Sequence, residues 1–376
     1  MIVERLALER RVLASLEAGR IPVVLGGCGT GRTSLLLRVE RALGTDHAQY
    51  VDFAAAATTP ERCLAAVLQA SRFTDAPAPA PPTPRAAFDA LLRYVDQPSS
   101  QGAPVALLID EVLDVRTFES FPGLRHVQRE MVARLAETPT RIVLTSRFTA
   151  RTHRLLRDAP ARFEVIHIPA LTAAEVQAMA RLFDGGRREW ADDAAPAIAT
   201  LSGGRASYVA LLLDALSAMG PAIDPVAALA ALFAPGGRLT ARCRESYELR
   251  LHRARGYGAL KAILGVLAQD EPRNLTEIAL ALHRTPGSTK DYLSWLEDVD
   301  LITSRGKRYS FEDPLLRLYV RLYGRPTPPS DDDVVREIGA YAREHLPGAH
   351  EFEVPVAASV EAAAGSDRSS GIIEID

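Results

Sequence analysis

The chain has 376 residues, of which 47% are hydrophobic and 24% charged, as is typical of a soluble globular protein with room for two or three domains. A formal net charge of −3 excludes a global positive field, so nucleic acid or membrane would have to bind a local basic patch. The three cysteines are too widely spaced for a disulfide framework or a zinc site, no apolar run is long enough to span a bilayer, and no signal-peptide core is present. We therefore expect a cytoplasmic protein with no membrane partner.

The first informative stretch is a glycine-rich loop near the N-terminus. An amphipathic helix is predicted over residues 3–19 and a buried parallel strand over 21–25, after which the chain reads GGCGTGRTS. This spacing matches a phosphate-binding loop, G-x-x-x-x-G-K-[ST], in which main-chain N–H groups and the following helix dipole face phosphate oxygens. The nucleotide contacts predicted from the loop are Gly26, Gly27, Cys28, Gly29, Thr30, Gly31, Arg32, Thr33 and Ser34.

Arg32 departs from the motif, because it stands where the lysine belongs. Only three of the 44 basic residues are lysines, so the exchange partly reflects a bias of the whole chain. Arginine is a planar fork on a longer arm, whereas lysine is a compact point charge. We expect nucleotide binding to tolerate the exchange better than hydrolysis does. Thr33 is predicted to offer its hydroxyl to Mg²⁺.

The next elements continue an alternation of strands and helices. A short strand is predicted over 48–53 and a helix from Glu61 to about Phe73. The proline-rich run 76–84 is interpreted as an insertion loop rather than as a ligand for an SH3-like partner. A helix is predicted over 85–95.

A second informative stretch is VALLIDE, residues 105–111, in which five apolar residues end in two acids. It predicts a buried central strand with carboxylates at its C-terminal edge, where ligands of open α/β sheets bind. Asp110 is expected to hold Mg²⁺ through water, and Glu111 to orient or deprotonate an attacking water. A strand that ends in a polar turn is the alternative, which the glycine-rich loop makes weaker.

An arginine-rich region follows a helix predicted over 124–136. Residues 141–146 and 163–168 are predicted strands, and six arginines lie between positions 141 and 162 against one acid, Asp158. Such a cluster could neutralise phosphate in cis or reach a neighbouring subunit as an arginine finger. A solvated basic helix is at least as good an interpretation for every arginine of the cluster except Arg147.

Beyond residue 170 the pattern becomes helical. A capping box over 171–175 opens a helix, and LSGGRAS leads into another with Arg205 at its start. Helices over 258–269, 274–283 and 288–298, with a hairpin over 301–311, predict a winged helix, and a last helix is predicted over 332–345.

The winged helix raises the question of DNA binding. Arg305, Lys307 and Arg308 make its hairpin basic and are the candidate DNA contacts. Residues 258–323 nevertheless hold nine basic and nine acidic residues, whereas a dedicated DNA reader shows a stronger positive face. Packing against the nucleotide domain is the competing role, and duplex DNA is the less favoured partner.

Together these features resemble the STAND branch of the AAA+ P-loop ATPases, and in particular the archaeal-type ATPases with a C-terminal winged helix. The resemblance covers about residues 1–323 and rests on GGCGTGRTSLL, ALLIDE, RIVLTSR, LSGGRASYVALLL and YSFEDPLLRLYV. It implies that Arg147 senses the γ-phosphate, and it makes Arg205 a candidate second sensor although the family's proline is missing there. No N-K-x-D element for guanine is visible, which favours ATP.

The resulting expectation is an α/β fold, in which a doubly wound parallel five-stranded P-loop sheet is followed by a helical lid and a winged helix. The predicted boundaries are 1–170 for the nucleotide-binding domain, 171–256 for the lid, 257–323 for the winged helix, 324–352 for a linker and helix, and 353–376 for a disordered tail.

Three functions from different classes are compatible with these features of the sequence. The first is an ATP- and Mg²⁺-dependent conformational or assembly switch with weak hydrolysis, acting on itself or on a protein partner. The second is a nucleotide-binding scaffold without useful hydrolysis. The third is an ATP-regulated DNA-binding protein. Glu111, Arg147 and Arg205 are the predicted catalytic residues, and Thr33 and Asp110 the predicted metal ligands.

Overall fold

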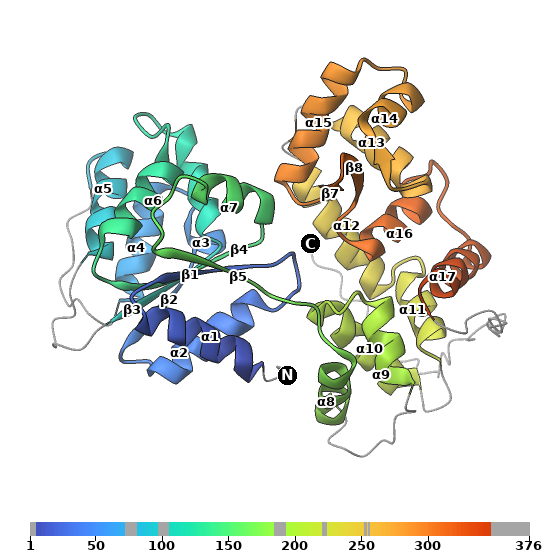
Figure 1. Cartoon of the computed structure of the whole chain (residues 1–376), viewed down its shortest axis with the longest axis horizontal. Coiled ribbons are helices and arrows are strands. Elements are labelled where there is room, and N and C mark those ends of the chain that lie inside the picture. Colours follow the sequence, from blue (N-terminus) through green and yellow to red (C-terminus); the bar gives the residue numbers. More distant parts are fainter. Residues whose placement is uncertain are drawn as a thin grey trace, which may run out of the picture.

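The computed structural model describes residues 5–71, 81–96, 105–183, 193–219, 224–251, 254 and 256–346. They form two lobes that lie side by side, an α/β lobe made by the N-terminal half and a mostly helical lobe made by the C-terminal half (Figure 1). The predicted tail 353–376 and most of the proline-rich run 76–84 lie outside the described residues.

The α/β lobe is built on one parallel sheet with strand order β2-β3-β4-β1-β5. The prediction of a five-stranded parallel sheet is confirmed, and each strand lies within one residue of its predicted bounds. The strands are β1 (Ile21–Leu25), β2 (Ala48–Asp52), β3 (Ala106–Asp110), β4 (Arg141–Ser146) and β5 (Phe163–His167).

The central strands are mostly apolar and almost entirely buried because helices cover both faces of the sheet. Every residue of β1 and β3 is buried. On one face, α1 (Leu6–Glu17) and α2 (Arg32–Leu43) pack their apolar stripes against Val24, Leu108 and Val143. The other helices of the lobe cover the opposite face (Figure 1). They are α3 (Phe53–Ala56), α4 (Pro60–Gln69), α5 (Pro84–Val95), the 3₁₀ helix η1 (Val112–Ser120), α6 (Val127–Glu137) and α7 (Thr149–Leu156).

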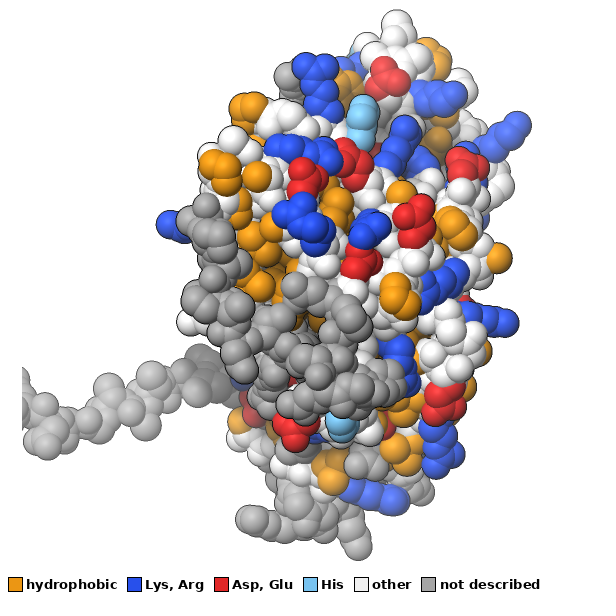
Figure 2. Space-filling model, turned by 90° about the vertical axis from the view of Figure 1, so that its left-hand side faces the viewer, with side chains coloured by type: hydrophobic (Ala, Val, Ile, Leu, Met, Phe, Trp, Pro, Cys, Tyr) orange, Lys and Arg blue, Asp and Glu red, His pale blue; other side chains and the backbone are white. Residues whose placement is uncertain are grey.

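The outer face of the α/β lobe shows no uniformly basic area among its described side chains. Figure 2 shows arginines interspersed with carboxylates and single apolar residues over this face. Arg85 is one example, because it pairs with both Asp89 and Glu130 at 2.8 Å. A phosphate-rich partner therefore finds no single-sign surface here.

The C-terminal lobe is helical apart from a small antiparallel sheet of order β6-β8-β7. One hydrophobic core extends through it from Leu171 to Ala342, across the predicted boundaries at 256 and 323, which stay predictions. Its elements are α8 (Ala173–Phe183), α9 (Ala194–Leu201), α10 (Ala206–Met219), α11 (Pro225–Phe233), α12 (Arg238–Leu251), α13 (Tyr257–Gln269), β6 (Arg273–Asn274), α14 (Leu275–Ala281), α15 (Pro286–Asp298), β7 (Ile302–Arg305), β8 (Arg308–Phe311), α16 (Pro314–Tyr323) and α17 (Asp331–His345).

Local capping explains several of the helix starts. The capping box predicted at 171–175 is present, since the Glu175 carboxylate accepts from the Thr172 N–H at 2.8 Å and the Thr172 hydroxyl accepts from the Glu175 N–H at 3.2 Å. Asn274 and Glu277 form the same reciprocal cap at the start of α14. Helix α15 starts at Pro286, two residues earlier than predicted, because the Thr285 side chain caps it and proline is well suited to the first helical position.

The two lobes meet at α7. The Asp300 carboxylate, just after α15, accepts from the N–H groups of Thr149 at 2.6 Å and Ala150 at 3.2 Å, which are the first amides of α7. Arg154, further along α7, donates to Asp298 at 3.1 Å. The C-terminal lobe thus supplies the N-terminal cap of a helix in the other lobe. None of the helices in the described ranges combines the length and apolar character needed to cross a membrane.

Candidate functional site

The order of the strands brings the predicted site residues together. Strand β4 lies between β1 and β3, and all three end at the same edge of the sheet. The glycine-rich loop follows β1, the acids Asp110 and Glu111 close β3, and Arg147 follows β4. The three motifs therefore converge at the carboxyl edge, where open α/β sheets bind their ligands.

The loop turns tightly into α2 by means of two glycines. Gly31, the residue before α2, has φ +98° and Gly29 has φ +78°, conformations that residues with a Cβ rarely adopt. A Cβ on Gly29 would also collide with the hydroxyl of Ser207 from the other lobe. The Gly29 carbonyl accepts from the Ser207 N–H at 2.9 Å, so the loop and the start of α10 are in direct contact.

Arg32 points into the loop. Its Nη1 donates to the carbonyl oxygens of Gly26 and, at 2.5 Å, Gly27, while Nη2 donates to Glu111 Oε1 at 2.5 Å. Only 8% of Arg32 is exposed, and its Nε has no partner among the described residues. The guanidinium thus ties the loop to the acid after β3.

The predicted metal ligands are adjacent. Thr33 Oγ1 donates to Asp110 Oδ2 at 2.6 Å, and Tyr50 donates to the same oxygen at 3.0 Å. Thr145 donates to the other carboxylate oxygen. Burial and the neighbouring Asp110 raise the pKa of Tyr50, so its hydroxyl stays a donor. A hydroxyl and a carboxylate are the hard oxygen donors that Mg²⁺ prefers.

Glu111 is held in a left-handed conformation with φ +54° and is 7% exposed. Both of its carboxylate oxygens are engaged. Oε1 accepts from Arg32 and lies 3.7 Å from Arg147 Nη1, and Oε2 accepts from the main-chain N–H of Arg147 at 3.0 Å. A non-glycine residue in this region costs about 1 kcal/mol or more, and such residues cluster at functional sites.

Arg147 connects this acid to the 3₁₀ helix η1. Its Nη2 donates to both oxygens of Asp114, at 3.0 and 2.8 Å. Burial alone would lower the pKa of Arg147, but Glu111 and Asp114 outweigh it and raise that pKa. Burial raises the pKa of Asp114, and Arg147 opposes this rise. Asp114 was not predicted as part of the site, because it lies in a segment for which the sequence suggested no structure.

Arg205 reaches the loop from the C-terminal lobe, as its predicted sensor role requires. Its Nη1 donates to the Cys28 carbonyl at 3.5 Å and Nη2 to the Glu312 carbonyl at 3.1 Å, while Nε lies 3.6 Å from Asp313. Burial opposes the charge of Arg205, but Asp313 and its other neighbours raise the pKa of the guanidinium.

Arg250 in α12 is a contact that sequence reasoning missed. Its Nη2 lies 3.1 Å from Cys28 Sγ, and its Nη1 donates to the Asp300 carbonyl at 2.8 Å. Burial would raise the pKa of the Cys28 thiol, but the adjacent Arg250 lowers it. No local signal marks Arg250, because arginine is abundant in this chain and α12 is far from the loop in sequence.

A cavity of about 500 Å³ opens over the loop, which is within the usual size range of small-molecule sites. Its apolar wall comes from both lobes and includes Leu8, Ile168, Leu171 and Met179, which suits an aromatic base. The Nε of Arg32 and the hydroxyl of Ser207 lie at this cavity without a partner among the described residues. The remaining polar lining is Arg5, Cys28, Gly29, Thr30, Gly31, Thr33, Ser34, Arg38, Arg147 and Arg242. These groups fit a nucleotide triphosphate with Mg²⁺.

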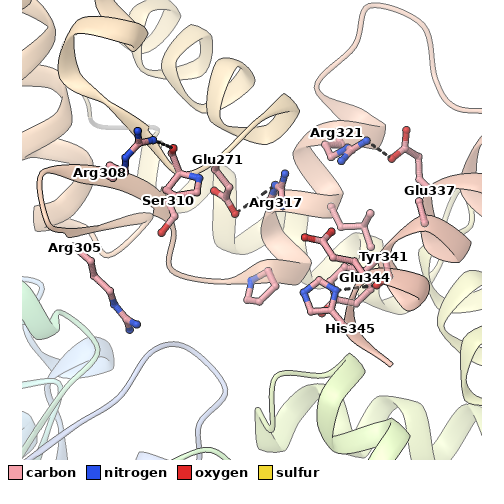
Figure 3. Close-up of a pocket in the computed structure, with 14 residues that line it drawn as sticks. Glu271, Arg305, Arg308, Ser310, Arg317, Arg321, Glu337, Tyr341, Glu344 and His345 are labelled. Atoms are coloured by element: carbon pink, nitrogen blue, oxygen red, sulfur yellow. Dashed lines mark hydrogen bonds and ion pairs between the residues drawn. The ribbon is translucent and has the colours of Figure 1, made fainter. Parts of the chain in front are cut away.

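The three candidate DNA contacts lie elsewhere, on the β7–β8 hairpin. Lys307 is exposed at its turn with φ +65°. Arg308 donates to the Pro272 carbonyl at 2.8 Å and lies 3.9 Å from Glu277. Figure 3 shows the side chains of Arg305 and Arg308 leaving the hairpin in different directions. The structure does not bring these residues to the loop.

Among solved structures, the chain is similar to the Walker-type ATPase of Pyrococcus abyssi, with a TM-score of 0.63 and 17% identity over 85% of this chain and 96% of that chain. RuvB of Thermotoga maritima matches with a TM-score of 0.43 and 13% identity over 82% of this chain and 92% of that one. A STAND protein with a tetratricopeptide repeat sensor from Pyrococcus horikoshii matches with a TM-score of 0.34 and 16% identity over 93% of this chain and 46% of that one. Only the first similarity is strong enough to identify a shared fold. No family model matches the chain, and no curated protein does.

Proposed function

We propose that this chain, which has the fold of a P-loop ATPase, binds ATP with Mg²⁺ and acts as a nucleotide-dependent conformational switch with slow hydrolysis. The observation that supports this most is that the glycine-rich loop, Arg32 and Thr33 line one cavity, while Thr33 donates to Asp110 and Arg32 donates to Glu111 directly behind it. Slow hydrolysis is supported by the arginine at position 32, where the motif has a lysine, and by the ion pair that this arginine forms with Glu111.

Each residue has a distinct role in the proposal. The loop N–H groups and the N-terminus of α2 bind phosphate oxygens. Thr33 and Asp110 would hold Mg²⁺, which neutralises phosphate charge when it is bound. Glu111 orients or deprotonates a water, but only after it leaves Arg32. Arg147 would sense a third phosphate, and its contacts with Glu111 support this role.

The switch follows from what the arginines contact now. Arg205 and Arg250 connect the loop to Glu312, Asp313 and Asp300 of the C-terminal lobe. A triphosphate competes for these guanidiniums, because a charge-assisted bond to phosphate is stronger than one to a neutral carbonyl. Binding should therefore change how the lobes are held together. Assembly with other copies, or capture of a protein partner, is the proposed output.

A hydrolysis-deficient scaffold is the second candidate, and a specific observation favours it. Arg32 and Arg147 engage both carboxylate oxygens of Glu111, so an attacking water would have to share these oxygens with two arginines. If Arg32 keeps this pairing when nucleotide is bound, the chain binds ATP without turning it over.

The test measures ATP affinity by calorimetry and phosphate release in wild type, E111Q and the control E119Q. Glu119 is a neighbouring acid outside the site, paired with Arg116 at 3.7 Å. We expect Mg²⁺-dependent ATP binding in all three, with affinities within about threefold, because the amide oxygen that E111Q introduces would still accept from Arg32. Turnover should be lost in E111Q alone, by about a hundredfold or more, as is usual when a general base is removed.

Three results would overturn parts of the proposal. Equal turnover in E111Q and wild type would refute the role of Glu111. Turnover at background in wild type, with binding intact, would establish the scaffold. Absence of ATP–Mg²⁺ binding in wild type would refute nucleotide function altogether.

A further inference from the structure

A second cavity, of about 380 Å³, lies in the C-terminal lobe between the β7–β8 hairpin, α16 and the end of α17 (Figure 3). It shares no lining residue with the nucleotide cavity. Its lining includes four arginines, Arg305, Arg308, Arg317 and Arg321, and three acids, Glu271, Glu337 and Glu344.

Two of these arginines are neutralised by acids of the cavity. Arg317 pairs with Glu271 at 3.4 Å, and Arg321 pairs with Glu337 at 2.9 Å. In each pair the arginine lies on α16 and the acid on another wall of the cavity, and dashed lines mark both pairs in Figure 3. They hold the walls together and contribute little net charge to a ligand.

The other two arginines retain positive charge for a ligand. Arg305 makes no hydrogen bond or ion pair with the residues that the structure describes. Arg308 has a side chain that is 52% exposed, and the nearest carboxylate, Glu277, lies 3.9 Å away. Pro272, Pro314 and Leu318 add apolar surface between them. This combination fits an extended peptide with acidic and apolar residues.

We propose that the acidic C-terminal segment, residues 347–376, binds in this cavity of its own chain. Glu344 and His345, near the end of α17, line the cavity, so the segment starts at its rim. It carries six acidic residues against one arginine, and it begins with an alternation of acidic and apolar residues, Glu351 to Val354. The stretch from Leu346 to Glu351 spans up to about 17 Å when extended, starting from the rim of the cavity. Glu351 or Glu353 would pair with Arg308.

The occupied cavity would connect the segment to the nucleotide site. Strand β8 lines the cavity through Arg308 and Ser310 and continues into Glu312, whose carbonyl accepts from Arg205. A bound segment would restrain this connection between the hairpin and α16. The binding of the segment itself does not depend on the proposed nucleotide function.

The experiment follows cleavage of the full-length chain by a glutamate-specific protease at Glu361. Wild type is compared with R308E and with the matched control K307E, which makes the same charge change on the neighbouring residue, exposed and outside the cavity lining. We expect R308E to speed cleavage about threefold to fivefold, the effect of losing one partly exposed ion pair. K307E should be cleaved at the wild-type rate. Circular dichroism melting confirms that each variant folds.

A second variant avoids any change to the folded lobe. E351R/E353R should also speed cleavage at Glu361, and combining it with R308E should slow it again by restoring opposite charges. Equal cleavage rates in wild type, R308E and E351R/E353R would overturn the proposal. Protection from cleavage that increases with protein concentration would also overturn it, because the segment would then bind a second copy. Duplex DNA binding that R308E abolishes, with the cleavage rate unaffected, would overturn it as well.

Discussion

At the residue scale, the substitution at the P-loop lysine position has a structural consequence that spacing alone could not give. Arg32 is long enough to cross the loop and reach Glu111 while still binding the carbonyls of Gly26 and Gly27. The pair is buried, with side-chain exposures of 8% and 9%. Removing one partner of such a pair leaves an uncompensated charge, at a cost of about 3–5 kcal/mol. Arg32 and Glu111 are therefore one unit.

We expect R32K to raise ATP turnover. A lysine ammonium is a single point charge, whereas the guanidinium of Arg32 binds the loop carbonyls and Glu111 at the same time. With lysine at position 32, the Glu111 carboxylate would be freer to bind a water. An increase of about tenfold corresponds to about 1.4 kcal/mol of barrier. Phosphate release under saturating ATP measures it. R38K is the control, because Arg38 also lines the cavity but pairs with Glu9 on α1. Turnover that is unchanged or lower in R32K would contradict a restraining role for Arg32.

At the element scale, the cap of α7 is supplied from far away in sequence. No residue at the start of α7 caps it with its own side chain, and Asp300, 151 residues further on, accepts from Thr149. Asp300 has φ +50° and is 8% exposed, and burial raises the pKa of its carboxyl to about 6 despite the two amide donors. The charge on Asp300 thus costs folding free energy at neutral pH.

This pKa predicts the direction of a pH effect. The unfolded chain has an Asp300 pKa near its ordinary value of 3.8, so between pH 4 and 6 the folded state binds more protons and stability falls as pH rises. The unfolding free energy of wild type relative to D300N should drop by about 2–3 kcal/mol from pH 4 to pH 7. Urea unfolding of both proteins at several pH values measures it. A pH-independent difference between the two proteins would contradict the raised pKa.

At the scale of the whole molecule, a series of contacts connects the two lobes through the site. Cys28 in the loop contacts Arg250, and Arg250 donates to the Asp300 carbonyl. The Asp300 carboxylate caps α7. Helix α7 begins two residues after Arg147, which contacts Glu111. Each step is a contact between neighbouring groups. Movement of one lobe would therefore change the surroundings of Glu111.

We expect R250A to loosen the cap of α7. Loss of the bond to Asp300 should speed hydrogen exchange at the Thr149 and Ala150 amides by about fivefold, since one such contact contributes about 1 kcal/mol. Exchange measured by mass spectrometry over residues 147–156 tests this. R242A is the control, because Arg242 lies on the same helix and lines the cavity but pairs with Glu245. Equal exchange in the two variants would show that Arg250 does not transmit between lobes.

Much of the α/β lobe could be predicted because its signals are local. Residues 21–25 and 106–109 are apolar because helices cover both sides of the sheet, and that burial is visible in the sequence itself. The elements that were missed include η1 and β6. The 3₁₀ helix η1 has no regular periodicity, and β6 is only two residues long. Neither leaves a pattern that can be recognised in sequence.

By itself, the sequence determined the parallel P-loop sheet and put Thr33, Asp110, Glu111 and Arg147 at or shortly after the ends of predicted strands, because an apolar run and the residues that follow it are local features. The order of the strands, which brings these ends together, came from the tertiary structure. Only the tertiary structure decided what these groups touch. The Arg32–Glu111 pair, the reach of Arg250 to Cys28 and the capping of α7 by Asp300 join residues 79, 222 and 151 positions apart. Such contacts depend on side-chain length and on how the lobes pack, and neither leaves a trace in local sequence.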